Sequence, residues 1–86
     1  MDAIREIIFY KDYFDNFFES LTEKVKDKID EVLFMITMLE RIPVKYFKSI
    51  KSARGLFEIR VEYESNIYRI FYCFDKGNLV VLFNGF

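Results

Sequence analysis

The sequence has no histidine and no tryptophan, and only one cysteine, one proline and three glycines among its 86 residues. Without histidine, any proton transfer in catalysis must use a carboxylate, tyrosine or lysine side chain. The single Cys73 cannot form an internal disulfide and is most simply a small core residue. No apolar run approaches the roughly 20 residues of a membrane span, and a signal-peptide pattern is absent. We therefore expect a cytoplasmic protein that does not contact the membrane.

The chain also lacks metal-ligand spacing, a glycine-rich phosphate loop and a nucleophile elbow, so we expect no metal and no cofactor. Apolar and aromatic residues are abundant instead, at 52% and 20%. A single domain over residues 1–86 is small, and it needs a large apolar share to fold alone. This aromatic excess is larger than such a monomer needs, and it indicates a surface for a partner or for self-association.

Charge is divided between the two halves of the sequence. Residues 1–40 carry five basic and ten acidic side chains, whereas residues 41–86 carry eight basic and four acidic ones. Five cations fall within fourteen residues that contain no acid: Arg41, Lys45, Lys48, Lys51 and Arg54. Such a patch can bind the phosphates of a nucleic acid. A solvated basic linker is the alternative.

Apolar periodicity predicts one strand followed by two helices. Residues 4–10 have the apolar, β-branched character of an edge strand. Residues 12–21 form a short helix that Asp12 can cap. The four residues from Ser20 to Glu23 have the capping-box form that opens a second helix. Apolar residues then recur at spacings of four and three from Val25 to Leu39, and Pro43 ends the helix.

Three strands are predicted in succession at residues 56–63, 67–74 and 79–83. The turns between them are residues 64–66 and 75–78, with Gly77 in a left-handed position. The last strand is continuously apolar, which is typical of a central strand covered on both faces. We therefore predict an α+β fold of order β-α-α-β-β-β, a small antiparallel sheet with the N-terminal helical hairpin on one face.

The strand phrases GLFEIRV (55–61), IYRIFYCFD (67–75) and LVVLFNGF (79–86) occur in this order. Together they resemble the RelE/ParE superfamily of bacterial toxins, and within it the HigB-type, phage-derived host-inhibition branch. The resemblance covers essentially the whole chain. It implies a small cytoplasmic toxin that a cognate antitoxin, expected to be a helix-turn-helix protein, holds inactive.

The same resemblance suggests the activity. Many members of the superfamily cleave mRNA on the ribosome, and the ParE branch instead inhibits DNA gyrase. We therefore expect a ribosome-dependent mRNA endonuclease. A gyrase inhibitor without nuclease activity, or a module that only binds the antitoxin, remains an alternative.

The match ends where HigB-type proteins carry a basic K-K-T-x-K-T-P phrase and a C-terminal helix. This chain ends at Phe86, so we expect a toxin shortened at its C-terminus. Fewer cations would weaken RNA binding, and a lost transition-state contact would slow cleavage. We expect this form to fold but to be weakly toxic or non-toxic.

Cleavage of RNA by its own 2′-OH needs a proton acceptor, positive charge on the phosphorane and a proton for the leaving 5′-oxygen. The resemblance implies that Arg69 contacts the scissile phosphate. It gives Arg60 and Glu58 active-site positions on the preceding strand. If the two strands pair, all three side chains can share the sheet face opposite the helices, and Lys45, Lys48, Lys51 and Arg54 then line the RNA approach. The alternative is a cross-strand salt-bridge cluster without chemical function.

The tyrosines have structural interpretations as well. Tyr68 and Tyr72 lie on one side of their strand, and we expect them in the core rather than as a catalytic base. Tyr46 and Phe47, in the basic connector, either stack on a nucleobase or pack the connector against the domain.

Overall fold

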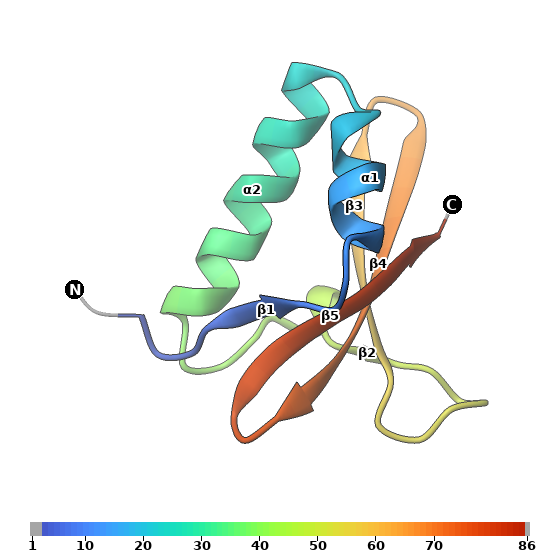
Figure 1. Cartoon of the computed structure of the whole chain (residues 1–86). Coiled ribbons are helices and arrows are strands. Elements are labelled where there is room, and N and C mark those ends of the chain that lie inside the picture. Colours follow the sequence, from blue (N-terminus) through green and yellow to red (C-terminus); the bar gives the residue numbers. More distant parts are fainter. Residues whose placement is uncertain (1–2, 86) are drawn as a thin grey trace.

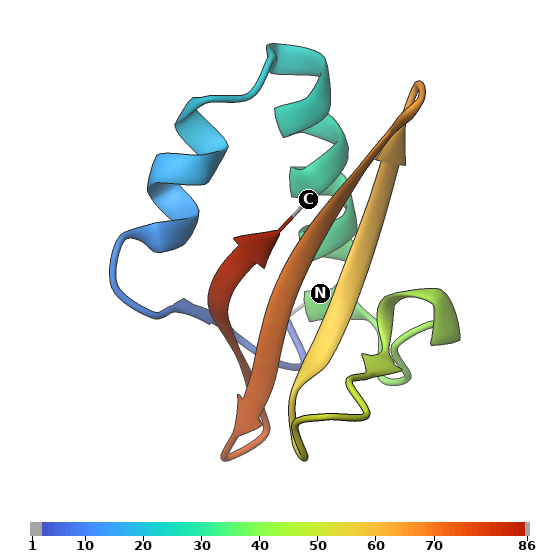
Figure 2. The same cartoon turned by 90° about the vertical axis from the view of Figure 1, so that its right-hand side faces the viewer.

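The computed structural model describes residues 3–85, and the side chains of residues 3–82. It has two helices and a five-stranded sheet of order β1-β5-β4-β3-β2. The elements along the chain are β1 (Ile7–Phe9), α1 (Tyr13–Glu19), α2 (Glu23–Met38), the short 3-10 helix η1 (Val44–Tyr46), β2 (Lys48–Ser49), β3 (Phe57–Tyr63), β4 (Asn66–Asp75) and β5 (Asn78–Gly85). Both helices lie on one side of the strands, as Figures 1 and 2 show. The predicted α+β class and helical hairpin are confirmed.

The sheet is mixed rather than wholly antiparallel. Strands β2 to β5 pair antiparallel with their neighbours, but β1 runs parallel to β5. The chain leaves β1 through two helices, so no tight turn forces this strand to be antiparallel to its neighbour. The prediction of a purely antiparallel sheet is therefore wrong for β1.

The connector before β3 contains structure that the sequence did not predict. Helix η1 and strand β2 lie within it, and β2 places Lys48 opposite Glu58 and Ser49 opposite Phe57. β2 is only two residues long and forms an edge of the sheet. The basic residues around it therefore lie beside the sheet, not on a free linker.

The two predicted hairpin turns are present. Strand β3 pairs with β4 from Phe57 opposite Tyr72 to Tyr63 opposite Asn66. Between β4 and β5, Lys76 and Gly77 both have positive φ, at 52° and 84°. Positive φ at both central residues is the geometry of a type I′ turn, whose twist matches that of the strands it joins. The left-handed position predicted for Gly77 is confirmed.

The core forms between α1, α2 and the inner face of the sheet. Its most deeply buried side chains alternate along the strands, with Ile59 and Ile70 among them, and pack under Ile29 and Ile36 of α2. In β5, Leu79 is fully buried but Val80 is only half-buried. The prediction that β5 is covered on both faces is therefore wrong, because within the described residues no helix lies on the outer face (Figure 2). Phe83, the last residue of that predicted strand, has its side chain outside the described part.

The helix boundaries follow the prediction but the caps do not. Asp12 and Thr22 occupy the N-cap positions of α1 and α2, and neither side chain makes a capping hydrogen bond. The Ser20 hydroxyl donates to the carbonyl of Phe17 at 2.6 Å, which closes the end of α1. Because Thr22 is the N-cap of α2, Ser20 lies two residues before the position that a capping box needs, and the predicted capping box does not form. Neither helix of the described chain is long and apolar enough to cross a membrane.

Arg5 closes the C-terminal end of α2, which ends at Met38, five residues before Pro43. Its guanidinium donates to the carbonyl oxygens of Ile36, Leu39 (2.6 Å) and Glu40 (2.8 Å). A cation at this end also opposes the negative end of the helix dipole. A residue before β1 thus ties the start of the chain to the end of α2.

We expect Arg5→Ala to lower the free energy of unfolding by about 1.5–3 kcal/mol, since hydrogen bonds to a charged group contribute that much. Urea denaturation measures the difference. Arg41→Ala is the matched control, because the exposed Arg41 guanidinium has no partner within residues 3–82. If Arg5→Ala and Arg41→Ala lowered the free energy of unfolding equally, Arg5 would not stabilise the end of α2.

Tyr72 is a core residue, as predicted. Its side chain is fully buried and its hydroxyl donates to the carbonyl of Tyr46 at 2.8 Å. Burial raises the pKa of this hydroxyl far above its usual 10.0, and the positive charge of Arg5 offsets only part of that rise. Tyr72 therefore stays protonated and is no general base. Tyr68 also faces the helices, with its ring 6.4 Å from that of Phe17.

Because the pKa of Tyr72 is raised, the free energy of unfolding changes with pH in the alkaline range. The unfolded chain loses the Tyr72 proton near pH 10, while the folded chain keeps it to higher pH. The stabilisation that the protonated Tyr72 gives the folded state is therefore complete below about pH 10. Above that pH, the free energy of unfolding falls by up to about 1.4 kcal/mol per pH unit. We expect Tyr72→Phe to lose about 1 kcal/mol at neutral pH and to show a shallower alkaline decline. Urea unfolding between pH 7 and 11 measures both effects, with the exposed Tyr13→Phe as control.

Candidate functional site

The pairing of β3 with β4 brings the predicted site residues together. Arg60 lies directly opposite Arg69, and Glu58 is two residues from Arg60 on the same side of β3. Their neighbours Ile59 and Ile70 are buried beneath the helices. Side chains alternate along a strand, so the three charged residues share the outer face of the sheet. We call Glu58, Arg60 and Arg69 the charged cluster.

Glu58 and Arg60 form an ion pair. The Arg60 Nε donates to Glu58 Oε1, and Glu58 is only 6% exposed. A carboxylate this buried needs a cationic or hydrogen-bonding partner. Arg60 supplies it, and in return Glu58 holds the guanidinium against the sheet.

Arg69 is left without an equivalent partner. Its Nε is buried and has no hydrogen bond within the described chain. Directly opposite positions place Cβ atoms only about 4.5–5.5 Å apart, and like charges there are destabilising. The cluster thus holds two arginines and one carboxylate, which is engaged by Arg60, so it has an excess of positive charge. An anion from outside the chain would satisfy Arg69.

A basic hollow of about 380 Å³ adjoins the cluster and shares Arg60 with it. Its lining comes from α2, η1, β2 and β3, and consists of Lys28, Lys45, Tyr46, Lys48, Arg60 and Glu62. Two of the predicted RNA-binding lysines, Lys45 and Lys48, are therefore beside Arg60. The other two predicted residues, Lys51 and Arg54, are exposed in the loop between β2 and β3 and do not line the hollow.

Sequence reasoning missed Lys28 and Glu62. Lys28 belongs to the acidic half of the chain and reaches the site only because α2 packs on β3. Glu62 continues the alternation of Glu58 and Arg60 along β3, and that pattern was a usable signal. Unlike Glu58, its side chain is exposed.

The connector aromatics differ from one another. Tyr46 is 8% exposed and belongs to the core, so it packs the connector against the domain rather than stacking on a base. Phe47 is 42% exposed, and its ring lies 4.7 Å from that of Phe57 and 5.9 Å from that of Phe74.

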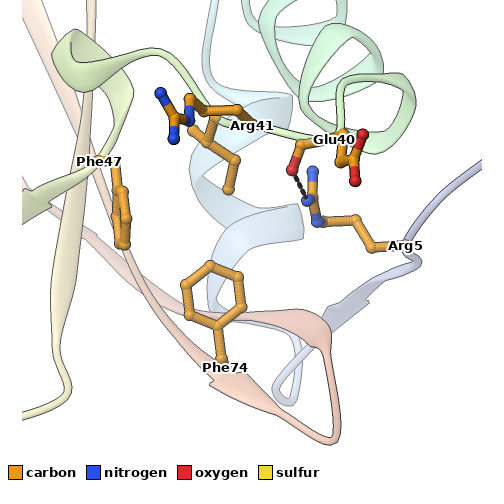
Figure 3. A pocket seen from close by; sticks show the side chains of 6 residues that line it. Arg5, Glu40, Arg41, Phe47 and Phe74 are labelled. Atoms are coloured by element: carbon orange, nitrogen blue, oxygen red, sulfur yellow. Dashed lines mark hydrogen bonds between the residues drawn. The ribbon is translucent and has the colours of Figure 1, made fainter.

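A second hollow, of about 510 Å³, lies at the end of α2. It is lined by Arg5, Glu40, Arg41, Ile42, Phe47 and Phe74, and Figure 3 labels all of these except Ile42. Its Arg5 is already bound to helix carbonyls. This hollow is separate from the charged cluster and shares none of its residues. Within residues 3–85, no three His, Cys, Asp or Glu side chains gather as a metal site would require.

Comparison with known proteins assigns the chain to a family. Residues 16–86 match the family model described as Phage derived protein Gp49-like (DUF891). The chain belongs to this family. A search of curated proteins finds no match for this Gp49-like protein.

Solved structures show a shared fold. A chain of the intact E. coli RelBE toxin–antitoxin complex superposes with a TM-score of 0.69 at 16% identity, over 94% of each chain. A mutant of E. coli toxin RelE in the free state gives a TM-score of 0.63 at 17% identity, over 98% of this chain and 83% of that one. The Gp49-like protein therefore has a RelE-like fold, as the strand phrases predicted.

The charged cluster predicts opposite effects for its two arginines. We expect Arg69→Met to raise the free energy of unfolding by about 1 kcal/mol, because it removes a buried unpaired donor and the repulsion from Arg60. Arg60→Met should lower it, because it leaves Glu58 buried without a partner. Urea denaturation of both variants measures whether the free energy of unfolding rises for Arg69→Met and falls for Arg60→Met. A comparable loss in both would identify the cluster as a purely structural ion-pair network.

Proposed function

We propose that this Gp49-like protein is the toxin of a toxin–antitoxin pair, of HigB/RelE type, and that in its full form it cleaves mRNA on the ribosome. The observation that carries the proposal is the arginine pair on the outer face of a RelE-like sheet. Two guanidinium groups on directly opposite strand positions, one of them held by a neighbouring carboxylate, suit a phosphate group. The resemblance of the strand phrases to toxins of this kind supports the same assignment.

The proposed reaction is attack of a ribose 2′-oxygen on the adjacent phosphorus. The 2′-OH proton passes to a carboxylate, the bond to the 5′-oxygen breaks, and that oxygen takes up a proton. The products are a 2′,3′-cyclic phosphate and a 5′-hydroxyl. Arg69 and Arg60 donate to the non-bridging oxygens, whose negative charge grows in the transition state. Proton transfer and charge stabilisation thus come from side chains of β3 and β4.

The two carboxylates of β3 have different roles in this proposal. Glu58 is buried with one oxygen bound to Arg60, so it is foremost the residue that orients Arg60. Its second oxygen can still accept a proton. Glu62 offers a more accessible carboxylate in the basic hollow next to Arg60. Glu62→Gln and Glu58→Gln, compared at fixed pH, therefore separate proton transfer from positioning.

The partner in this proposal is a cognate antitoxin. E. coli RelE was crystallised with its antitoxin in one of the matched structures. Large apolar side chains are exposed along β1 and the start of α1, namely Ile8, Phe9, Tyr10 and Tyr13. A continuous apolar edge of this kind indicates an interaction surface. A small helix-turn-helix gene directly beside this one would support the pairing.

A second function, gyrase inhibition without cleavage, is favoured by two observations. The more buried carboxylate of the site, Glu58, is engaged by Arg60, and the outer face towards β5 is apolar at Phe71 and Val80. Primer extension on mRNA after induction separates the two functions. Discrete cuts within codons support the nuclease, and their absence with intact growth arrest supports the inhibitor.

In the full form of the toxin, we expect Arg69→Ala to relieve growth inhibition and to reduce cleavage by about 10²–10³-fold, the usual loss when one transition-state donor is removed. The cleavage rate with purified ribosomes is the measurement. Lys24→Gln, on an exposed part of α2, should leave the rate unchanged. A folded Arg69→Ala protein with undiminished activity would exclude Arg69 from the mechanism.

A further inference from the structure

The basic hollow gathers more positive charge than the fold needs. Four of its six lining residues are cations, and Glu62 is its single acid. Its volume of about 380 Å³ lies within the range of about 300–1,000 Å³ typical of ligand sites. Arg60 is paired with Glu58, which leaves three lysines and one acid, Glu62, and this excess of positive charge is unfavourable unless a further anion binds.

Lys28 is the informative member of this set. Acidic residues surround it along α2, including Asp27, Asp30 and Glu31. In spite of this, no carboxylate of the described side chains pairs with the Lys28 ammonium. Its side chain is half-buried, so part of its stem lies on the protein while it lines the hollow. The helix therefore presents an unneutralised cation to the hollow.

The cations also follow one another across the outer face of the sheet, from β4 towards the β2 edge. From Arg69 it continues to Arg60 and on to Lys48 and Lys45 at the β2 edge. On the other side, towards β5, the outer face carries Phe71, Cys73 and Val80. Among the described side chains of the outer face, the cations that follow Arg69 therefore lie towards β2, and a polyanion held at Arg69 meets them when it extends that way.

We propose that the basic hollow binds a backbone phosphate of single-stranded RNA, and that Lys28 is one of its contacts. The strand then leaves the charged cluster across the β2 edge of the sheet, towards α2. This path rests on the proposed function, because it starts at the phosphate held by Arg60 and Arg69. It adds a residue of the helical layer to a site otherwise built from strands and the connector.

The test is equilibrium binding of a fluorescein-labelled oligouridylate, measured by anisotropy without ribosomes at several salt concentrations. Each phosphate contact contributes about 0.7 to the slope of log K against log salt for single strands. We expect Lys28→Gln to reduce the slope by about 0.7, which corresponds to about eightfold weaker binding at 50 mM salt. Lys28→Arg should restore both values, and Lys24→Gln, one turn earlier on α2, should change neither.

The outcomes separate this inference from the proposed function. An unchanged slope for Lys28→Gln would overturn the RNA path, whatever the ribosomal cleavage assay shows. A reduced slope together with absent ribosomal cleavage would refute the nuclease and retain the site. Equal loss of binding to polyglutamate would show a general anion site and overturn the assignment to RNA. If Lys28→Gln does not fold, Lys48→Gln gives the same test from the β2 edge.

Discussion

The register between β3 and β4 is the constraint on which both the core and the site depend. A slip of one residue would turn Ile59 and Ile70 away from the helices and bring the charged cluster into the core. The helical layer resists such a slip, because it buries one set of alternating residues and no other. The same pairing leaves Arg60 and Arg69 face to face. Hydrophobic burial on one face thus positions the charges on the other.

Stability and anion binding oppose each other at Arg69. A buried guanidinium nitrogen without a partner costs free energy, and a second arginine directly opposite adds to that cost. Glu58 and Arg60 show the contrasting case, in which pairing makes burial tolerable. Among residues 3–82, Arg60 has Glu58 as its partner, whereas the buried Arg69 Nε has none.

Sequence reasoning succeeded where local pattern determines the result. Alternation along β3 and the turn at residues 64–66 predicted the β3–β4 hairpin, and with it the common face of Glu58, Arg60 and Arg69. It failed where distant segments meet. The parallel pairing of β1 follows from how the helices return the chain, and Lys28 joins the site only through packing of α2 on β3. The sequence around Lys28 is acidic, so its charge pattern pointed away from RNA.

The placement of Lys28 relies on the burial of α2 as a whole. The next residue, Ile29, is fully buried, so the backbone at Lys28 cannot move without opening the core. At the far end of the same helix, Arg5 holds the last carbonyls and ties α2 to the segment before β1. α2 is therefore anchored along its length by apolar side chains and at its end by a cation. A rigid helix of this kind can present one lysine at a constant position beside Arg60, which is what a phosphate contact requires.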